Sequence, residues 1–187
     1  MSVAEWTIRE ARESDAAALA ELAERTFRDA FAAVNAAADM DLHCARHYAP
    51  AIQAAEIAGP LATTLVVERD GELIGYAQLS RRPVTVPEGD HPTPAVEIYR
   101  FYVLHAWHGS GLAAALMDAC VAHARETGAS LLRLGVWEHN PRAMRFYEKH
   151  GFAVVGEQPF VLGKDPQRDL VMTRPLAPPS EALAPIE

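Results

Sequence analysis

Two glycines past the middle of the chain have the spacing of an anion-binding turn. Gly109 and Gly111 follow a strand-like run, Ala95 to Leu104, and the pattern of a helix begins directly after them. The first amides of a helix lack carbonyl partners, and the helix dipole makes that end positive. Glycine also lets the backbone approach a ligand closely. The segment predicts a cradle for a phosphate or pyrophosphate, although a Gly-x-Gly pair taken alone is more typical of a plain turn.

Two other phosphate-binding loops do not fit these residues. A Walker loop requires Gly-Lys-Ser/Thr after its spacer, and that sequence is absent here. A dinucleotide-binding fingerprint requires a third glycine in an early strand-turn-helix unit. Ala114 stands at that place, and the segment lies late in the chain.

A second segment carries a tyrosine on a short helix, predicted from Asn140 to His150. Asn140 followed by Pro141 favours a helix start, and Gly151 favours a helix end. These local rules explain the helix but do not require Tyr147, which taken alone is more often a packed aromatic residue. A phenol of pKa about 10 can protonate a thiolate whose parent thiol has a pKa of about 8.5.

Together the two segments resemble the GNAT acetyltransferases. The run His108-Gly109-Ser110-Gly111-Leu112-Ala113 resembles the pyrophosphate motif Gln/Arg-x-x-Gly-x-Gly/Ala of that family, with His108 in place of the usual Gln or Arg. The run from Asn140 to Phe152 is similar to the GNAT pattern Asn-x-x-Ala-x-x-Phe-Tyr-x-Lys-x-Gly-Phe and matches each specified position. The resemblance implies an enzyme that uses acetyl-CoA as cosubstrate and needs no metal.

The resemblance also implies where coenzyme A binds. Pantetheine amides would bond the edge of the central strand, the turn would hold the pyrophosphate through backbone amides, and Asn140 would contact the pantetheine or nearby backbone. Tyr147 would be the catalytic acid that protonates the thiolate. The cofactor-binding residues expected on this basis are Phe101, Tyr102, Val103, Leu104, His108, Gly109, Ser110, Gly111, Leu112, Ala113, Asn140, Arg142, Tyr147 and Lys149.

The acceptor amine needs a base, because an amine of pKa about 10 is protonated at neutral pH. Glu97 is the candidate, since a glutamate at this place on the central strand acts as base in some GNAT members, whereas others use a water chain. The alternative is that the Glu97 carboxylate pairs with Arg100 or Arg133 at the end of a strand.

Segments near both ends resemble the PaiA-like polyamine acetyltransferases, so that the likeness covers most of residues 6–174. They are Thr26 to Phe31 with Asn35 and Asp39 to Asp41, and Gly156 to Met172. The resemblance implies spermidine or spermine as acceptor, with Phe27, Phe31, Asp39, Glu97 and Trp137 on the substrate side and Asp41 or Glu138 as further carboxylates. Protein N-termini, lysines and aminoglycosides remain alternative acceptors, and a catalytically silent acyl-CoA sensor is the alternative from another class.

The elements that must position these residues form one domain, 1–174, followed by a flexible tail, 175–187. Hydrophobic periodicity and turn residues predict the strands 7–9, 63–68, 73–79, 95–104, 131–137, 152–155 and 169–173 and the helices 16–33, 39–47, 50–59, 109–128 and 140–150. Asp70-Gly71 predicts a hairpin turn, and residues 81–94 a loop. The expected class is α/β (α+β): a mixed, mostly antiparallel GNAT sheet with a splayed parallel strand pair and helices on both faces.

Composition limits the partners. A net charge of −8 over 187 residues argues against nucleic acid and is compatible with a cationic substrate. We expect no membrane span and no signal peptide, and two isolated cysteines suggest a reducing compartment, so the expected location is cytoplasmic. His43 and His47 have a spacing that can bind zinc, but no third ligand is placed, so we expect no metal site. A homodimer is possible by resemblance.

Overall fold

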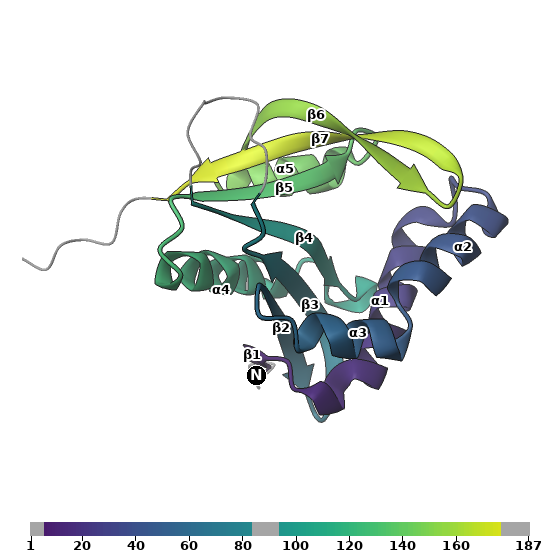
Figure 1. The fold of residues 1–187 in the computed structure, drawn as a ribbon, viewed down its shortest axis with the longest axis horizontal. Coiled ribbons are helices and arrows are strands. Elements are labelled where there is room, and N and C mark those ends of the chain that lie inside the picture. The colour runs from purple at the N-terminus through teal and green to yellow at the C-terminus, as the bar shows by residue number, and fades with distance from the viewer. Residues whose placement is uncertain (1–5, 84–93, 177–187) are drawn as a thin grey trace, which may run out of the picture.

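The computed structural model describes residues 6–83 and 94–176. The strands are β1 (Thr7–Glu10), β2 (Ala62–Arg69), β3 (Glu72–Ser80), β4 (Ala95–Val103), β5 (Leu131–Trp137), β6 (Ala153–Leu162) and β7 (Asp165–Pro175). The helices are α1 (Ala16–Phe31), α2 (Ala37–His47), α3 (Pro50–Ile57), α4 (Leu112–Glu126) and α5 (Pro141–Lys149), with short 3-10 turns at Glu13–Asp15 and His105–Trp107 (Figure 1). The element types and their order follow the prediction.

One seven-stranded sheet runs in the order β1-β2-β3-β4-β5-β7-β6, and only the pair β4 and β5 is parallel within it. That pairing ends at Ile98 and Leu134, beyond which the two strands diverge (Figure 1). Against β3, Ile98 pairs with Leu79 and Arg100 with Gln78, which leaves Tyr99 as an extra residue in a bulge. The predicted splayed parallel pair is therefore confirmed.

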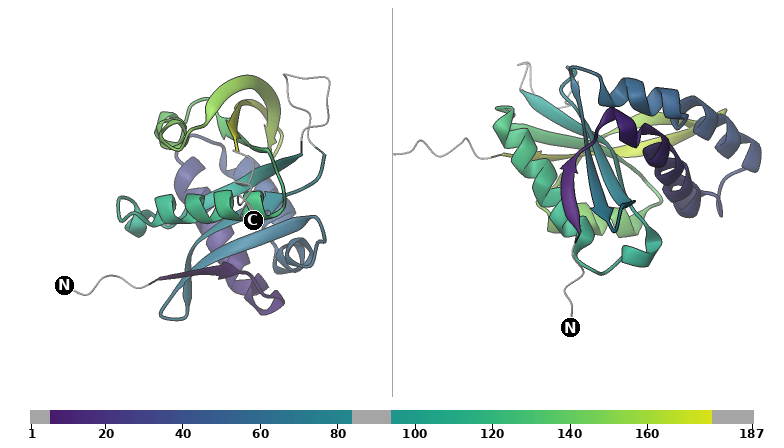
Figure 2. Two further views of the ribbon diagram at one scale, coloured as in Figure 1. Left: turned by 90° about the vertical axis from the view of Figure 1, so that its left-hand side faces the viewer. Right: turned by 90° about the horizontal axis from the view of Figure 1, so that it is seen from below.

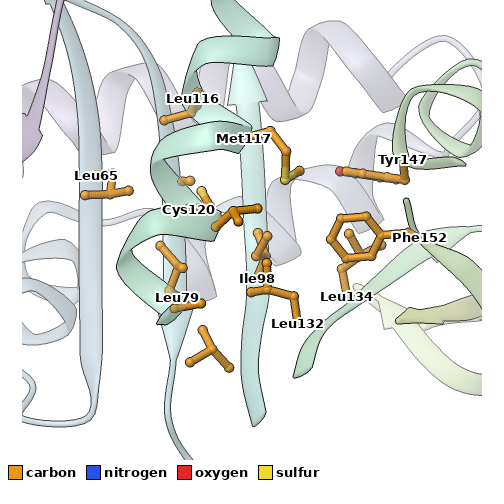
Figure 3. Packing of buried hydrophobic residues seen from close by; sticks show 14 of the residues in the cluster. Leu65, Leu79, Ile98, Leu116, Met117, Cys120, Leu132, Leu134, Tyr147 and Phe152 are labelled. Carbon is orange, nitrogen blue, oxygen red and sulfur yellow. The ribbon is translucent and has the colours of Figure 1, made fainter. Parts of the chain in front are cut away.

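The sheet separates two hydrophobic cores because neighbouring residues on a strand face opposite sides. Val66 and Tyr76 pack with residues of α1 and α2 on one face. Leu65, Val67 and Leu79 pack with α4 on the other face, where Leu116, Met117 and Cys120 meet the sheet (Figure 3). Figure 2 shows α4 on one side of the strands and α1–α3 on the other, so helices cover both faces as expected.

A buried polar network holds α3 against the sheet. Arg100 of β4 forms an ion pair with Glu56 of α3 and donates to the side-chain oxygen of Gln78. The Gln78 amide in turn donates to Gln53, at 3.1 Å, and to Glu56. Arg100 also lies 5.1 Å from the ring of Tyr48. An arginine with 10% of its side chain exposed needs such partners, because an unpaired charge is costly in the interior.

The last two strands are longer than the prediction, which placed them at 152–155 and 169–173. They form one hairpin joined at Gly163, whose φ is +63°. Pro159 lies within β6, which is an edge strand and therefore tolerates a residue without an amide hydrogen. Leu176 is buried and its amide donates to the Ser130 carbonyl, so the fold extends two residues into the predicted tail. Residues 84–93 of the predicted loop and 177–187 of the tail lie outside the described chain.

The Asp-Gly hairpin turn is present as predicted. Asp70 and Gly71 both have positive φ, +52° and +82°, which is the backbone of a type I′ turn between β2 and β3. This hairpin sets the antiparallel pairing of β2 and β3, and β4 then pairs with β3.

Candidate active site

A cavity of about 560 Å³ opens where β4 and β5 separate. Its wall takes residues from α1, β4, the turn before α4, β5 and α5. The predicted site residues in this wall are Phe31, Phe101, Tyr102, Val103, His108, Ala113, Trp137, Asn140, Arg142 and Tyr147. The separation of two parallel strands thus brings together motifs that lie about one strand-helix-strand unit apart in the sequence.

The glycine turn supplies unpaired backbone amides next to this cavity. Gly109 and Gly111 have φ of +81° and +90°, a region that L side chains rarely adopt, and Gly111 is the N-cap of α4. Within the described residues, no hydrogen bond occupies the amides of Gly109, Gly111, Ala113 or Ala114. Free amides at the positive end of a 15-residue helix are suited to a diphosphate.

His108 ties this turn to the end of β4. Its Nε2 lies 3.1 Å from the carbonyl oxygen of Val103, so Nε2 carries the hydrogen in this contact. Burial lowers the pKa of His108, and the nearby Arg142 lowers it further, which keeps the imidazole neutral near pH 7. The positive charge beside the cradle is therefore that of Arg142, while His108 acts as a neutral donor in place of the usual Gln or Arg.

Tyr147 lies on α5 with its ring enclosed by other aromatic rings. The ring centroids of Phe101 and Phe152 lie 6.2 and 5.8 Å away. Figure 3 shows the hydroxyl pointing away from Phe152 toward Met117 on α4. The side-chain oxygen of Asn140 accepts from the Ala143 amide at 3.1 Å and so fixes the start of α5. Burial raises the pKa of Tyr147, so the phenol keeps its proton and remains a donor.

Glu97 lies outside the cavity wall. It sits in the paired part of β4, directly opposite Arg133 of β5, and its carboxylate forms an ion pair with the Arg133 guanidinium. Arg133 also donates to the side-chain oxygen of Gln158 and is almost fully buried. Of the alternatives left open by the sequence, the structure shows the ion pair with Arg133.

Glu97→Gln is accordingly expected to lower the free energy of unfolding by about 2 kcal/mol, because it leaves Arg133 buried without a counter-charge. Denaturant unfolding and initial rates measured on the same preparation check this. Loss of most of the rate with unchanged stability would instead support Glu97 as the base.

The other acidic residues predicted for the acceptor are also engaged elsewhere. Asp39 accepts from the Lys164 amide at 2.7 Å and supports the turn between β6 and β7. Asp41 pairs with Arg28, and Glu138 pairs with Arg168. None of these three carboxylates lies in the wall of the cavity.

Several predicted residues have structural positions around the site. Phe27 is buried in the core beside α2, where its ring stacks on His43 at 4.4 Å. Leu104 packs between the two cores, and Lys149 is exposed on the last turn of α5. The residues Gly109, Ser110, Gly111 and Leu112 form the turn and helix start themselves, next to Ala113 in the wall.

Sequence reasoning missed several residues of the wall: Asp29, Tyr99, Arg100 and His105. It also missed Asp169, whose carboxylate lies beside Gly135, another wall residue. The strand pattern gave no sign of the bulge that turns Tyr99 toward the cavity. The position of Asp169 depends on the register of β7 against β5, which has no local signal.

The histidines with zinc-like spacing form an aromatic pair, with ring centroids 4.4 Å apart. Burial lowers the pKa of both His43 and His47. In residues 6–83 and 94–176, no group of three His, Cys, Asp or Glu side chains could hold a metal ion. Nor does any helix in that part of the chain have the length and apolar character needed to cross a membrane.

The acetyltransferase (GNAT) family model matches residues 16–152. This chain belongs to the GNAT family. An uncharacterized N-acetyltransferase of Mycobacterium tuberculosis is 37% identical over 163 residues, covering 87% of this chain and 99% of the relative. One of Lactobacillus delbrueckii is 32% identical over 156 residues, covering 83% and 88%.

Solved GNAT structures share the fold. The PaiA N-acetyltransferase of Thermoplasma acidophilum with coenzyme A aligns with a TM-score of 0.73 at 19% identity, over 91% of this chain and 99% of that one. YncA of Salmonella typhimurium, assigned as an acetyltransferase and solved with acetyl-CoA, aligns with a TM-score of 0.64 at 26% identity, over 97% and 98%.

The protein is therefore an acetyl-CoA-dependent N-acetyltransferase. Its own residues fit the cosubstrate: free amides and Arg142 lie where a diphosphate would bind, and the cavity between β4 and β5 is open to a pantetheine arm. The diverging edge of β4 offers unpaired backbone groups for the pantetheine amides.

Proposed function

We propose that this GNAT enzyme acetylates a primary amine of a polyamine such as spermidine or spermine. The observation that carries the proposal is the chemistry of the cavity wall near α1. There the Asp29 carboxylate lies with the rings of Phe31 and Trp137, whose centroids are 5.9 Å apart. A carboxylate together with aromatic faces attracts an alkylammonium chain. The net charge of −8 favours the approach of a polycation.

The PaiA-like terminal segments of the sequence point the same way. The PaiA protein among the structural neighbours supports the fold alone at 19% identity, so the acceptor rests on the wall residues. Other acceptors are protein N-termini, lysines and aminoglycosides. Some relatives carry the name mycothiol acetyltransferase. One of them, from Frankia alni, is 36% identical over 91 residues, which cover 48% of this chain and 27% of the relative.

In the proposed mechanism the amine attacks the thioester directly. The acceptor ammonium first loses one proton to solvent, and the nitrogen lone pair then forms the bond to the acetyl carbon. Backbone groups of β4 between Phe101 and Val103 polarise the acetyl oxygen. The nitrogen releases a second proton as the carbon–sulfur bond breaks, and its electron pair stays on sulfur. The Tyr147 hydroxyl protonates the sulfur and is reprotonated, so that one proton in total is released to solvent.

The test is thiol release from acetyl-CoA by the purified protein with spermidine, spermine, aminoglycosides and N-terminal peptides as acceptors. We expect kcat/KM for the polyamines to exceed that for the other amines by about tenfold or more, since their alkylammonium chains match the Asp29 carboxylate and the aromatic rings of Phe31 and Trp137 in the wall. Preferred turnover of a peptide or an aminoglycoside would move the assignment to that class. Binding of coenzyme A without turnover of any amine would favour a silent sensor, against which the presence of Tyr147 in the wall argues.

We also infer a cytoplasmic enzyme. Cys44 and Cys120 are both buried free thiols, which fits a reducing compartment. The homodimer implied by the family resemblance is checked by the mass of the protein in solution.

A further inference from the structure

Asp169 of β7 lies at the point where the two central strands part. It pairs with Trp137 of β5, and a Cβ placed on Gly135 would lie 3.1 Å from Asp169 Oδ2. Gly135 is the first β5 residue beyond the last β4–β5 pair, at Leu134, and both Gly135 and Trp137 line the cavity. The carboxylate therefore covers the backbone of the cavity wall on the side that faces α1.

No hydrogen bond or ion pair joins this carboxylate to another residue in the described part of the chain, although Gln158, its partner on β6, also places its side-chain nitrogen beside Gly135. Burial, without a contribution from a charged neighbour there, raises the pKa of Asp169 from 3.8 to about 6. Burial raises the pKa of Tyr102, a residue of the cavity wall, and Arg100 lowers it. The negative charge of Asp169 is a further, smaller cause that raises it. Asp169 is thus a partly buried carboxylate beside the cavity wall.

The cations on the surrounding strands already have acidic partners. Arg100 of β4 is paired with Glu56, and Arg133 of β5 is paired with Glu97. Arg168, the neighbour of Asp169 on β7, is paired with Glu138 and Glu157. On the α1 side the charged residue in the wall is Asp29, which is itself acidic. The remaining basic residues of the wall, His105, His108, His139 and Arg142, form no ion pair with Asp169 in the described chain, which leaves its charge open to a cation that enters the cavity.

We propose that Asp169 binds the ammonium group of the acceptor and takes a proton from its nitrogen during acyl transfer. The inference rests on the proposed function and names the residue that recognises the amine. The carboxylate accepts the proton that the nitrogen loses once its lone pair has formed the carbon–nitrogen bond, because that nitrogen is then a far stronger acid. It passes this proton to solvent, while the sulfur is protonated by Tyr147, so charge and protons balance as in the mechanism above.

Asp169→Asn keeps the shape of the side chain and removes its charge, and Asp118→Asn makes the same change on the exposed face of α4. With spermidine, Asp169→Asn is expected to lower kcat/KM by about 100-fold while the Kd of coenzyme A stays within about threefold of wild type. The rise of kcat/KM with pH through about 6 in wild type should be absent in this variant. Asp118→Asn should behave as wild type. A value for Asp169→Asn within about threefold of wild type overturns the proposal.

The pH dependence of thermal stability tests the raised pKa of the Asp169 carboxylate without a measurement of turnover. A raised folded-state pKa means that wild type loses stability as pH rises from 3.8 to about 6 and stays at that lower level above. Asp169→Asn should therefore melt higher than wild type above about pH 6 and show no such gain below about pH 4. An equal melting difference at both pH values would contradict an unpaired, desolvated Asp169.

The shift in melting temperature caused by the acceptor tests the ammonium site separately from the proposed acetyl transfer. In the presence of coenzyme A, spermidine should raise the melting temperature of wild type and of Asp118→Asn more than that of Asp169→Asn. If wild type turns over no amine but this difference is seen, the proposed reaction fails and the ammonium site stands. If spermidine stabilises none of the proteins, or wild type and Asp169→Asn equally, the ammonium site is overturned.

Discussion

Tyr147→Phe is expected to lower kcat by about 100-fold or more, with the KM for acetyl-CoA nearly unchanged. The substitution removes the hydroxyl and keeps the ring that packs against Phe101 and Phe152. The thiolate would then leave without a proton donor. Since burial raises the pKa of this phenol, its protonation should not limit the wild-type rate in neutral or mildly alkaline buffer. Steady-state kinetics and coenzyme A titration on the same preparation measure both quantities.

Tyr48→Phe is the matched control for this change. Tyr48 is also a buried tyrosine, but it belongs to the core beside α1 and α2 and not to the wall of the cavity. We expect this variant to keep its turnover. An unchanged kcat in Tyr147→Phe would remove the acid role and leave the silent sensor or a solvent proton donor as explanations.

Glu56→Gln is expected to lower the free energy of unfolding by about 3 kcal/mol. It leaves the Arg100 guanidinium in the interior with the Gln78 oxygen and the Tyr48 ring but without its counter-charge. The same network holds α3 on the sheet and fixes the strand that carries Phe101 and Tyr102, so activity should fall on heating before it does in wild type. Urea unfolding followed by circular dichroism measures the change.

Glu24→Gln is the control for this loss. The Glu24–Arg28 pair lies on the exposed surface of α1 and should contribute at most about 0.5 kcal/mol. A double variant that also replaces Arg100 with Met should recover much of the stability, because an apolar side chain needs no counter-charge. Equal effects of Glu56→Gln and Glu24→Gln would show that the buried position of Arg100 does not matter.

Local sequence rules determined much of the fold. The strand Leu131–Trp137 was predicted with its observed bounds, and the Asp70-Gly71 turn follows from the positive φ that both residues must adopt. Asn140, Pro141 and Gly151 mark the ends of α5 for reasons confined to that helix. Both predicted cosubstrate motifs could be recognised because each is one continuous segment of the chain.

Only the tertiary structure decided which charged side chains meet. Glu97 and Arg133 are 36 positions apart and pair because β4 and β5 are parallel in one register. Asp169 lies beside Gly135 of the cavity wall because β7 returns next to β5 and places it opposite Trp137, while Tyr99 lines the cavity because a bulge shifts the alternation of β4. Strand register is set by the packing of whole faces, and a carboxylate carries the same local signal whether it ends in an ion pair or beside an empty wall. The sequence by itself therefore determined the family and the cosubstrate and predicted Tyr147 as the acid, whereas the assembled sheet decided which carboxylates are paired and which we propose for the amine.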